Sequence, residues 1–212
     1  MKCSTIDFIN FNQNLHPLDV KYKQALISGI SSKYQFTPKL EDLKPVVAPN
    51  ELKQYLKKLL PKHFSLGKAG FYIEKDKLDL HPLYIGEHRV NLHIHTQNSD
   101  GSMTIDQYLE QSNAYSDKVA QKKYKDDIPP YISAITDHNN VDGVQEVLAR
   151  VADEPQKYKN FKFVPGCEFM FNDPNSGFEF TAFEAVGLGF NPFSEEILNK
   201  LSKFVSIKLA LI

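Results

Sequence analysis

Two histidines placed two residues apart, His93 and His95, are the first residues of this sequence whose spacing suggests chemistry. The surrounding segment RVNLHIHT alternates in polarity, which predicts a strand over residues 89–96. Side chains two apart on a strand project from one face, so we expect both imidazoles on one side and Leu92 and Ile94 on the other. Imidazole is the commonest metal-binding side chain, and this pair could chelate one cation. The pair alone is equally consistent with two unrelated strand histidines.

Further carboxylates and an imidazole follow the ends of predicted strands. Asp100 lies on the loop after the first strand, although Ser-Asp-Gly is also ordinary turn sequence. Asp137 and His138 follow the apolar segment YISAIT, and Glu168 ends the strand that begins at residue 161. The α/β folds assemble their sites at the carboxyl ends of strands, and a carboxylate can bridge two cations. Three successive strand ends with ligand-type side chains therefore predict a divalent metal site.

The segments that would position these side chains alternate between strand and helix periodicity. Thr104 and Gln107 have the spacing of a capping box, which predicts the start of a helix. The other expected elements are strands at residues 70–73, 131–136, 161–164 and 183–188, a helix at residues 139–152, and a helix capped by Ser194. The buried stripe of the helix at residues 139–152 would be Val144, Val147, Leu148 and Val151. Strands that alternate with amphipathic helices favour parallel βα units, and hence an α/β sheet or barrel.

The first 70 residues lack this alternation, and we interpret them as a partly helical N-terminal extension (residues 1–70). One helix is expected near residues 19–30. A second is expected after Asn50, whose side chain could cap it, and Pro61 should end or kink it. Its apolar stripe would be Leu52, Tyr55, Leu56, Leu59 and Leu60. Residues 71–212 would then form the metal-binding domain.

Three motifs together resemble a known family. HIHTQNSDGSMTIDQYL, ITDHNNVDGV and VPGCEF are similar, in order and spacing, to the first three motifs of the polymerase and histidinol phosphatase (PHP) family. The resemblance covers roughly residues 89–190. It implies a partial, distorted (β/α)7 barrel that binds two or three divalent metal ions and hydrolyses phosphate esters. Zinc, manganese or iron would suit such a mixture of histidines and carboxylates.

Carried over by position, the resemblance assigns the predicted ligands to separate ions. His93, His95 and Glu168 would share one metal, while Asp100 and His138 would belong to another. Glu168 would also bridge towards a middle metal. The function implied is that of a metal-dependent phosphoesterase acting on a small phosphorylated substrate, with water as the nucleophile and no separate catalytic residue identified.

The sequence departs from the family pattern in two places. Glu184 precedes the segment AVGLG, where the family commonly has a histidine. No histidine follows His138, so the later His-Pro and Asp-x-His motifs of the family have no counterpart before Ile212. We therefore expect the N-terminal part of a PHP-like domain, whose C-terminal part is missing. The alternative is a non-catalytic PHP-like module that binds metal weakly or serves as a scaffold.

Other reactive residues receive structural interpretations. Asp137 is expected to orient the neighbouring ligands rather than bind metal. Cys167 is expected to be a small buried residue, since no partner base is identifiable. The remaining histidines are isolated and are not expected at the site; they are His16, His63, His81 and His88.

Composition sets the remaining limits. The chain has 25 Lys and Arg against 26 Asp and Glu, so no overall cationic field exists to attract nucleic acid, which is a possible but not favoured partner. Its two cysteines form no CxxC pair, which argues against a disulfide framework or thiolate zinc site. No signal-peptide core or membrane span is evident, so we expect a soluble cytoplasmic protein of unknown oligomeric state.

Overall fold

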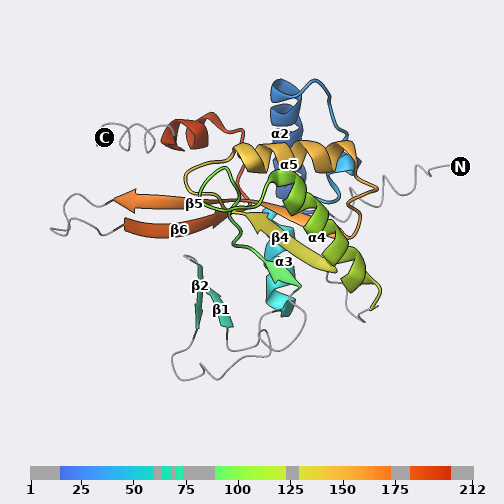
Figure 1. Ribbon diagram of the computed structural model, residues 1–212, viewed down its shortest axis with the longest axis horizontal. Coiled ribbons are helices and arrows are strands. Elements are labelled where there is room, and N and C mark those ends of the chain that lie inside the picture. Colours follow the sequence, from blue (N-terminus) through green and yellow to red (C-terminus); the bar gives the residue numbers. More distant parts are fainter. Residues whose placement is uncertain are drawn as a thin grey trace, which may run out of the picture.

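A curled, four-stranded mixed sheet organises the molecule (Figure 1). The computed structural model describes residues 15–59, 64–67, 70–73, 89–122, 129–172 and 182–201. The strand order is β3 (Val90–Asn91), β4 (Tyr131–Ile135), β5 (Phe161–Asn172) and β6 (Ala182–Leu188). A separate hairpin pairs β1 (Phe64–Gly67) with β2 (Gly70–Ile73). The mixed α/β class is confirmed, whereas a seven-stranded barrel stays a prediction.

Helices cover one face of this sheet. They are α2 (Pro17–Lys33), α4 (Ile105–Ala120) and α5 (Asp142–Asp153). Alternation along β4 sends Tyr131 and Ile135 into the core beneath these helices, where the predicted stripe of α5 is also buried. None of the helices in the described ranges combines the length and apolarity needed to cross a membrane.

The opposite face of the sheet is covered by α3 (Pro49–Leu59). Ile132 and Ala134 of β4 pack there against Leu52 and Leu56 of this helix. Parallel strands need cover on both faces, because both carry apolar side chains. The described part of the N-terminal extension therefore contributes directly to the core.

The link between α2 and α3 joins the sheet itself. It contains the 3₁₀ helix η1 (Leu40–Leu43). Val46 then forms a parallel bridge to Phe163 of β5, through hydrogen bonds that involve the Phe163 backbone. The division of the chain at residue 70 stays a prediction, but residues 17–56 share their core with the sheet.

Two helix starts differ from expectation. Asn50 is not a cap, because α3 begins at Pro49 and the Ala48 N–H donates to the Glu51 carboxylate at 2.8 Å. The helix expected from Asn139 begins instead at Asp142. Asn139 has a φ of 49°, in the left-handed region that asparagine tolerates and a right-handed helix excludes. Leu60 and Pro61 lie outside the described residues.

The expectation of parallel βα units fails at the last strand. β6 pairs antiparallel with β5, from Gly166 opposite Leu188 to Asn172 opposite Ala182. Only nine residues separate the two strands in sequence. An antiparallel return can be that short, whereas a parallel crossover needs a dozen residues or more.

The third strand is also longer than expected. The sequence pattern predicts a strand that begins at residue 161 and ends near Glu168, but β5 continues to Asn172. Its first half pairs with β4 and its second half pairs with β6. Glu168 therefore lies in the middle of a strand, just past the end of β4, where β5 changes partner.

A glycine in α2 tests how the segment after β6 is held. A Cβ atom at Gly29 would lie 2.2 Å from Cγ of Phe193, which packs against the main core. Helix propensity alone predicts that Gly29→Ala stabilises the protein by about 1 kcal/mol, but overpacking costs about 1–3 kcal/mol. We expect a net decrease in the free energy of unfolding, measured by urea denaturation.

Ser28→Ala provides the matched control, because Ser28 is exposed on the same helix. This control should be neutral or slightly stabilising. A Gly29→Ala protein as stable as Ser28→Ala would show that Phe193 does not dock closely against α2.

Candidate metal centre

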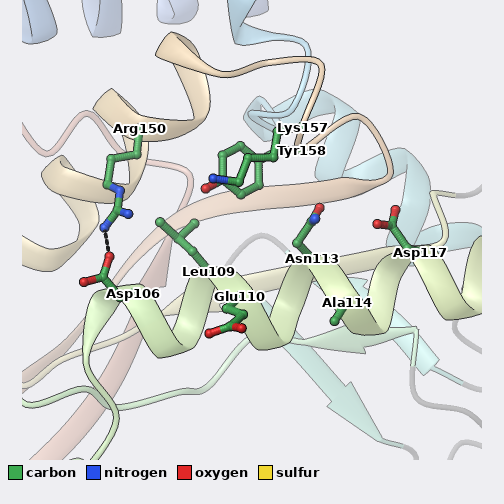
Figure 2. Close-up of a pocket in the computed structure, with 9 residues that line it drawn as sticks. All are labelled: Asp106, Leu109, Glu110, Asn113, Ala114, Asp117, Arg150, Lys157 and Tyr158. Carbon is green, nitrogen blue, oxygen red and sulfur yellow. Dashed lines mark hydrogen bonds and ion pairs between the residues drawn. The ribbon is translucent and has the colours of Figure 1, made fainter.

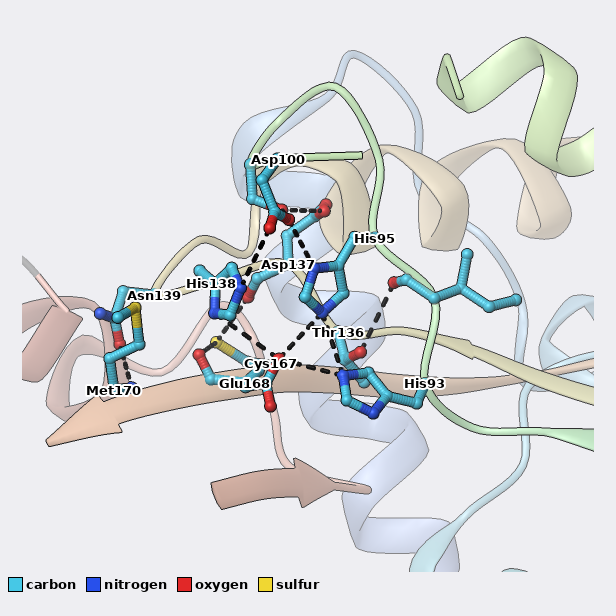
Figure 3. A network of polar contacts seen from close by, with 12 residues as sticks. His93, His95, Asp100, Thr136, Asp137, His138, Asn139, Cys167, Glu168 and Met170 are labelled. Carbon is cyan, nitrogen blue, oxygen red and sulfur yellow. Dashed lines mark hydrogen bonds and ion pairs between the residues drawn. The ribbon is translucent and has the colours of Figure 1, made fainter. Parts of the chain in front are cut away.

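The structure brings the five predicted ligand residues together at the end of β4 (Figure 3). The Glu168 carboxylate lies at their centre and is almost completely buried, with 5% of its side chain exposed. Its Oε2 atom is 3.0 Å from Nε2 of His93 and 2.9 Å from Nε2 of His95. The two Nε2 atoms are 3.0 Å apart. Three donor atoms thus face one common point.

The segment with the two histidines is less regular than predicted. Only Val90 and Asn91 pair with β4 as a strand, although the Thr136 N–H still donates to the Ile94 carbonyl. Leu92 packs against the core beneath α3, while Ile94 packs against the core beneath α4 and α5. The expectation that Leu92 and Ile94 share a face is therefore wrong. The alternation breaks where the ladder stops, and this break still leaves both imidazoles beside Glu168.

Backbone pairing places His138 against Glu168. The two residues form a parallel bridge, in which the Asn139 N–H donates to the Glu168 carbonyl at 2.9 Å. The left-handed Asn139 then turns the chain away, and its side-chain carbonyl accepts from the Met170 N–H at 3.1 Å. The end of β4 is thereby attached to the middle of β5, and the ligand positions on both strands are at one height.

A second group of donors adjoins the first and consists of His95, Asp100 and His138. Asp100 approaches His95 closely, with 2.6 Å between Oδ1 and Nδ1, and its Oδ2 atom is 3.5 Å from Nε2 of His138. The other ring nitrogen of His138, Nδ1, is buried and has no hydrogen-bond partner among the described residues. It lies 3.5 Å from Glu168 Oε2, which is too far for a good hydrogen bond. A buried ring nitrogen that lacks a hydrogen-bond partner is available to bind a cation.

His95 cannot serve both groups in the same way. A neutral imidazole that binds a cation through one nitrogen carries its proton on the other. Since Nε2 faces His93 and Glu168, we assign the proton to Nδ1, which donates to Asp100. A carboxylate behind a metal-binding histidine fixes the ring orientation in this manner. The other carboxylate oxygen of Asp100, Oδ2, then remains available to bind a cation beside His138.

The donor set fits a divalent cation. Donor atoms of a tetrahedral zinc site lie about 3.3 Å apart, because Zn–N bonds are about 2.0–2.1 Å long. The atoms of His93, His95 and Glu168 are 2.9–3.0 Å apart, close to that separation. His93, His95 and Glu168 provide three donors, as catalytic zinc sites do, and a fourth position would be available to water or substrate. With its proton on Nδ1, His95 leaves Asp100 and His138 as the donors of the second group. His93 and Asp100 are 56% and 67% exposed, so solvent reaches the site.

Asp137 and Cys167 lie behind the ligands. The Asp137 carboxylate is buried and accepts hydrogen bonds from Thr96 and Ser99 instead of facing the common point. Cys167 is fully buried, and burial raises the pKa of its thiol to about 12. The thiol therefore stays protonated near neutral pH and is a poor nucleophile.

The structure does not bring Glu184 into either group. Glu184 is exposed on β6 opposite Met170, two residue pairs beyond the pair of Glu168 with Val186. Among the isolated histidines, His16 caps α2 by accepting from the Leu18 N–H. The other three, His63, His81 and His88, lie outside the described residues.

A cavity of about 520 Å³ lies away from this centre, between α4 and α5 (Figure 2). Its wall contains none of the predicted ligands. Two of its charged side chains form ion pairs, Arg150 with Asp106 and Lys157 with Glu154. No sequence pattern predicts this cavity.

Comparisons with known proteins match only part of the fold. No family model and no curated protein matches the chain. An amidohydrolase from Chromobacterium violaceum, with bound sulfate and no metal, is 22% identical over 54% of this chain and 32% of that chain, with a TM-score of 0.38. A proposed metal-dependent phosphoesterase from Bifidobacterium adolescentis is 17% identical over 55% of this chain and 33% of that chain, with a TM-score of 0.35. The match spans about one third of each of these two structures.

The electrostatics of His95 predict how pH affects this centre. Burial lowers the pKa of His95, but the hydrogen bonds and charges of Asp100 and Glu168 outweigh it, so the pKa lies above 6.5. With a chelator present, protonated His95 stabilises the fold below pH 6.5, and this contribution is lost as pH rises through the raised pKa. A divalent ion requires the deprotonated ring. Added Zn²⁺ or Mn²⁺ should therefore raise Tm more at about pH 8 than at about pH 6.

His16→Asn serves as the control, because asparagine keeps an N-cap oxygen while the distant imidazole is removed. This variant should show the same pH dependence as the parent protein. An equal metal-induced Tm shift at both pH values would contradict the assignment of His95 as a ligand.

Proposed function

We propose that this chain is a metal-dependent hydrolase that acts on phosphate esters. The observation that carries the proposal is the convergence of His93, His95 and Glu168 on one point, with Asp100 and His138 beside them. The resemblance of the three sequence motifs to PHP phosphoesterases supports phosphate as the group attacked. The cofactor would be divalent, with zinc, manganese and iron as the candidates.

The residues present would hold such ions in distinct ways. His93, His95 and Glu168 would bind the first ion through Nε2, Nε2 and Oε2. A divalent ion held there supplies a Lewis acid that polarises a phosphoryl oxygen and lowers the pKa of water. Asp100 keeps the His95 proton on Nδ1 and thereby leaves Nε2 free to bind.

The negative charge of the site supports a reaction in which divalent cations accompany the phosphate ester. Asp100 and Glu168 place two carboxylates within reach of the same imidazole. Without divalent ions, these two carboxylates would repel a phosphate ester, which is itself anionic. Divalent ions would reverse the sign of the local charge and neutralise the phosphoryl oxygens as charge develops on them. His93 and Asp100, the exposed ligands, would border the side from which substrate enters.

One observation favours a second function, that of a non-catalytic module. The imidazoles of His93 and His95 are already within hydrogen-bond distance of Glu168 and of each other. This network could satisfy the buried carboxylate without any cation. The site would then act as a polar support within a scaffold.

The deciding experiment measures metal content and hydrolysis on the same preparations. We expect near-stoichiometric binding of Zn²⁺ or Mn²⁺, and metal-dependent release of phosphate from a generic phosphomonoester or diester. His93→Ala removes one donor from the first ion, so its affinity should fall more than the roughly 10–100-fold typical of losing a group behind a ligand. Hydrolysis should fall with it.

His16→Asn is again the matched control, since it removes a histidine outside the centre and should change neither property. Comparison of an oligonucleotide with small sugar phosphates distinguishes a nucleic-acid end from a small substrate. Metal binding without hydrolysis of any ester would support the non-catalytic module. Failure to bind metal at any pH would overturn both the hydrolase and the metal site.

A further inference from the structure

The loop that carries Asp100 is held from one side by a single buried carboxylate. We call residues 96–101 the Asp100 loop. Its backbone closes on itself, because the N–H groups of Ser99 and Gly101 both donate to the Thr96 carbonyl at 3.0 Å. These local turns shape the loop, but they do not attach it to the strand that carries His138.

Asp137 provides that attachment. Its Oδ1 atom accepts from the Thr96 N–H at 2.6 Å and from the Ser99 hydroxyl at 2.7 Å. Its Oδ2 atom accepts from the Thr96 hydroxyl at 2.6 Å. Only 1% of Asp137 is exposed, so these hydrogen bonds are shielded from bulk water. Both oxygens are therefore committed to the loop, and Asp137 contributes position instead of a metal ligand.

Two further contacts hold the same loop against its neighbours. The Asn140 side chain donates to the Asn98 carbonyl at 3.0 Å, from the segment that follows His138. Gly101 packs so tightly that a Cβ atom there would lie 2.2 Å from the His95 carbonyl oxygen. The loop can thus take few positions relative to His95 and His138, and Asp100 is directed at both rings.

We propose that Asp137 is the positioning residue of the Asp100 loop, and that it controls the cation position at Asp100 and His138 more than the one at His93, His95 and Glu168. This inference rests on the proposed metal centre and separates its two positions. Glu168 comes from β5 and is held by strand pairing with β4 and β6, which does not involve the Asp137 side chain. Loss of the carboxylate should therefore release Asp100 and leave the buried Glu168 in place.

The test uses the full chain and two measurements on each variant. Mn²⁺ titration counts the binding sites and their affinities, and hydrogen exchange detected by mass spectrometry follows residues 96–101 and β5 separately. Asp137→Ala should weaken the Asp100-dependent site by about 10–100-fold and increase exchange in the loop, with β5 still protected. Asp137→Asn retains an acceptor for the Thr96 N–H, and its amide can donate to the Thr96 hydroxyl. Compared with Asp137→Ala, Asp137→Asn should restore most of the Mn²⁺ affinity and most of the protection of the Asp100 loop from exchange.

Thr96→Val removes one of the three donors and should give an intermediate effect. Tyr108→Phe is the matched control, because it removes a buried hydrogen bond to Ser133 that lies in the core beneath α4. This control should lower stability without changing the ratio of the two Mn²⁺ affinities. Equal affinities and equal loop exchange in the parent and Asp137→Ala would overturn the inference. A parent protein that binds neither Mn²⁺ nor Zn²⁺ at any pH would refute the proposed function, while loop exchange would still test the role of Asp137.

Discussion

The buried carboxylate of Glu168 is the group on which the arrangement of the site depends. A carboxylate removed from water is costly unless donors or cations surround it. Here the imidazoles of His93 and His95 lie within hydrogen-bond distance, and His138 is slightly farther away. These groups come from three parts of the sheet. The fold must therefore bring the irregular end of β3, the end of β4 and the middle of β5 to one point.

Strand pairing meets this requirement because β5 changes partner at the right place. Its first half extends the parallel sheet through β4, and its second half forms an antiparallel ladder with β6. Glu168 lies just past this change, where the bridge to His138 fixes the relative height of the two residues. The N-terminal helices stabilise the same sheet from outside, since α2 and α3 cover apolar side chains on opposite faces.

Local sequence patterns predicted those features that depend on neighbouring residues. The capping box at Thr104 and Gln107 and the buried stripe of α5 are confirmed. Features that depend on distant pairing were missed. No local pattern shows that β6 returns antiparallel, because an apolar strand has the same periodicity in either direction. The start of α5 was misplaced because Asn139 adopts a left-handed conformation while it contacts β5.

The order of residue types along the chain sets the chemical character of the centre, because imidazoles and carboxylates follow successive strands. How these groups share their atoms depends on the three-dimensional arrangement of the strands. It turned Nδ1 of His95 towards Asp100, committed both oxygens of Asp137 to the Asp100 loop, and left Glu184 away from the other ligands. The reason is geometric. Spacing along a strand sets which face a side chain occupies, whereas sheet register and packing set the distances between residues remote in sequence.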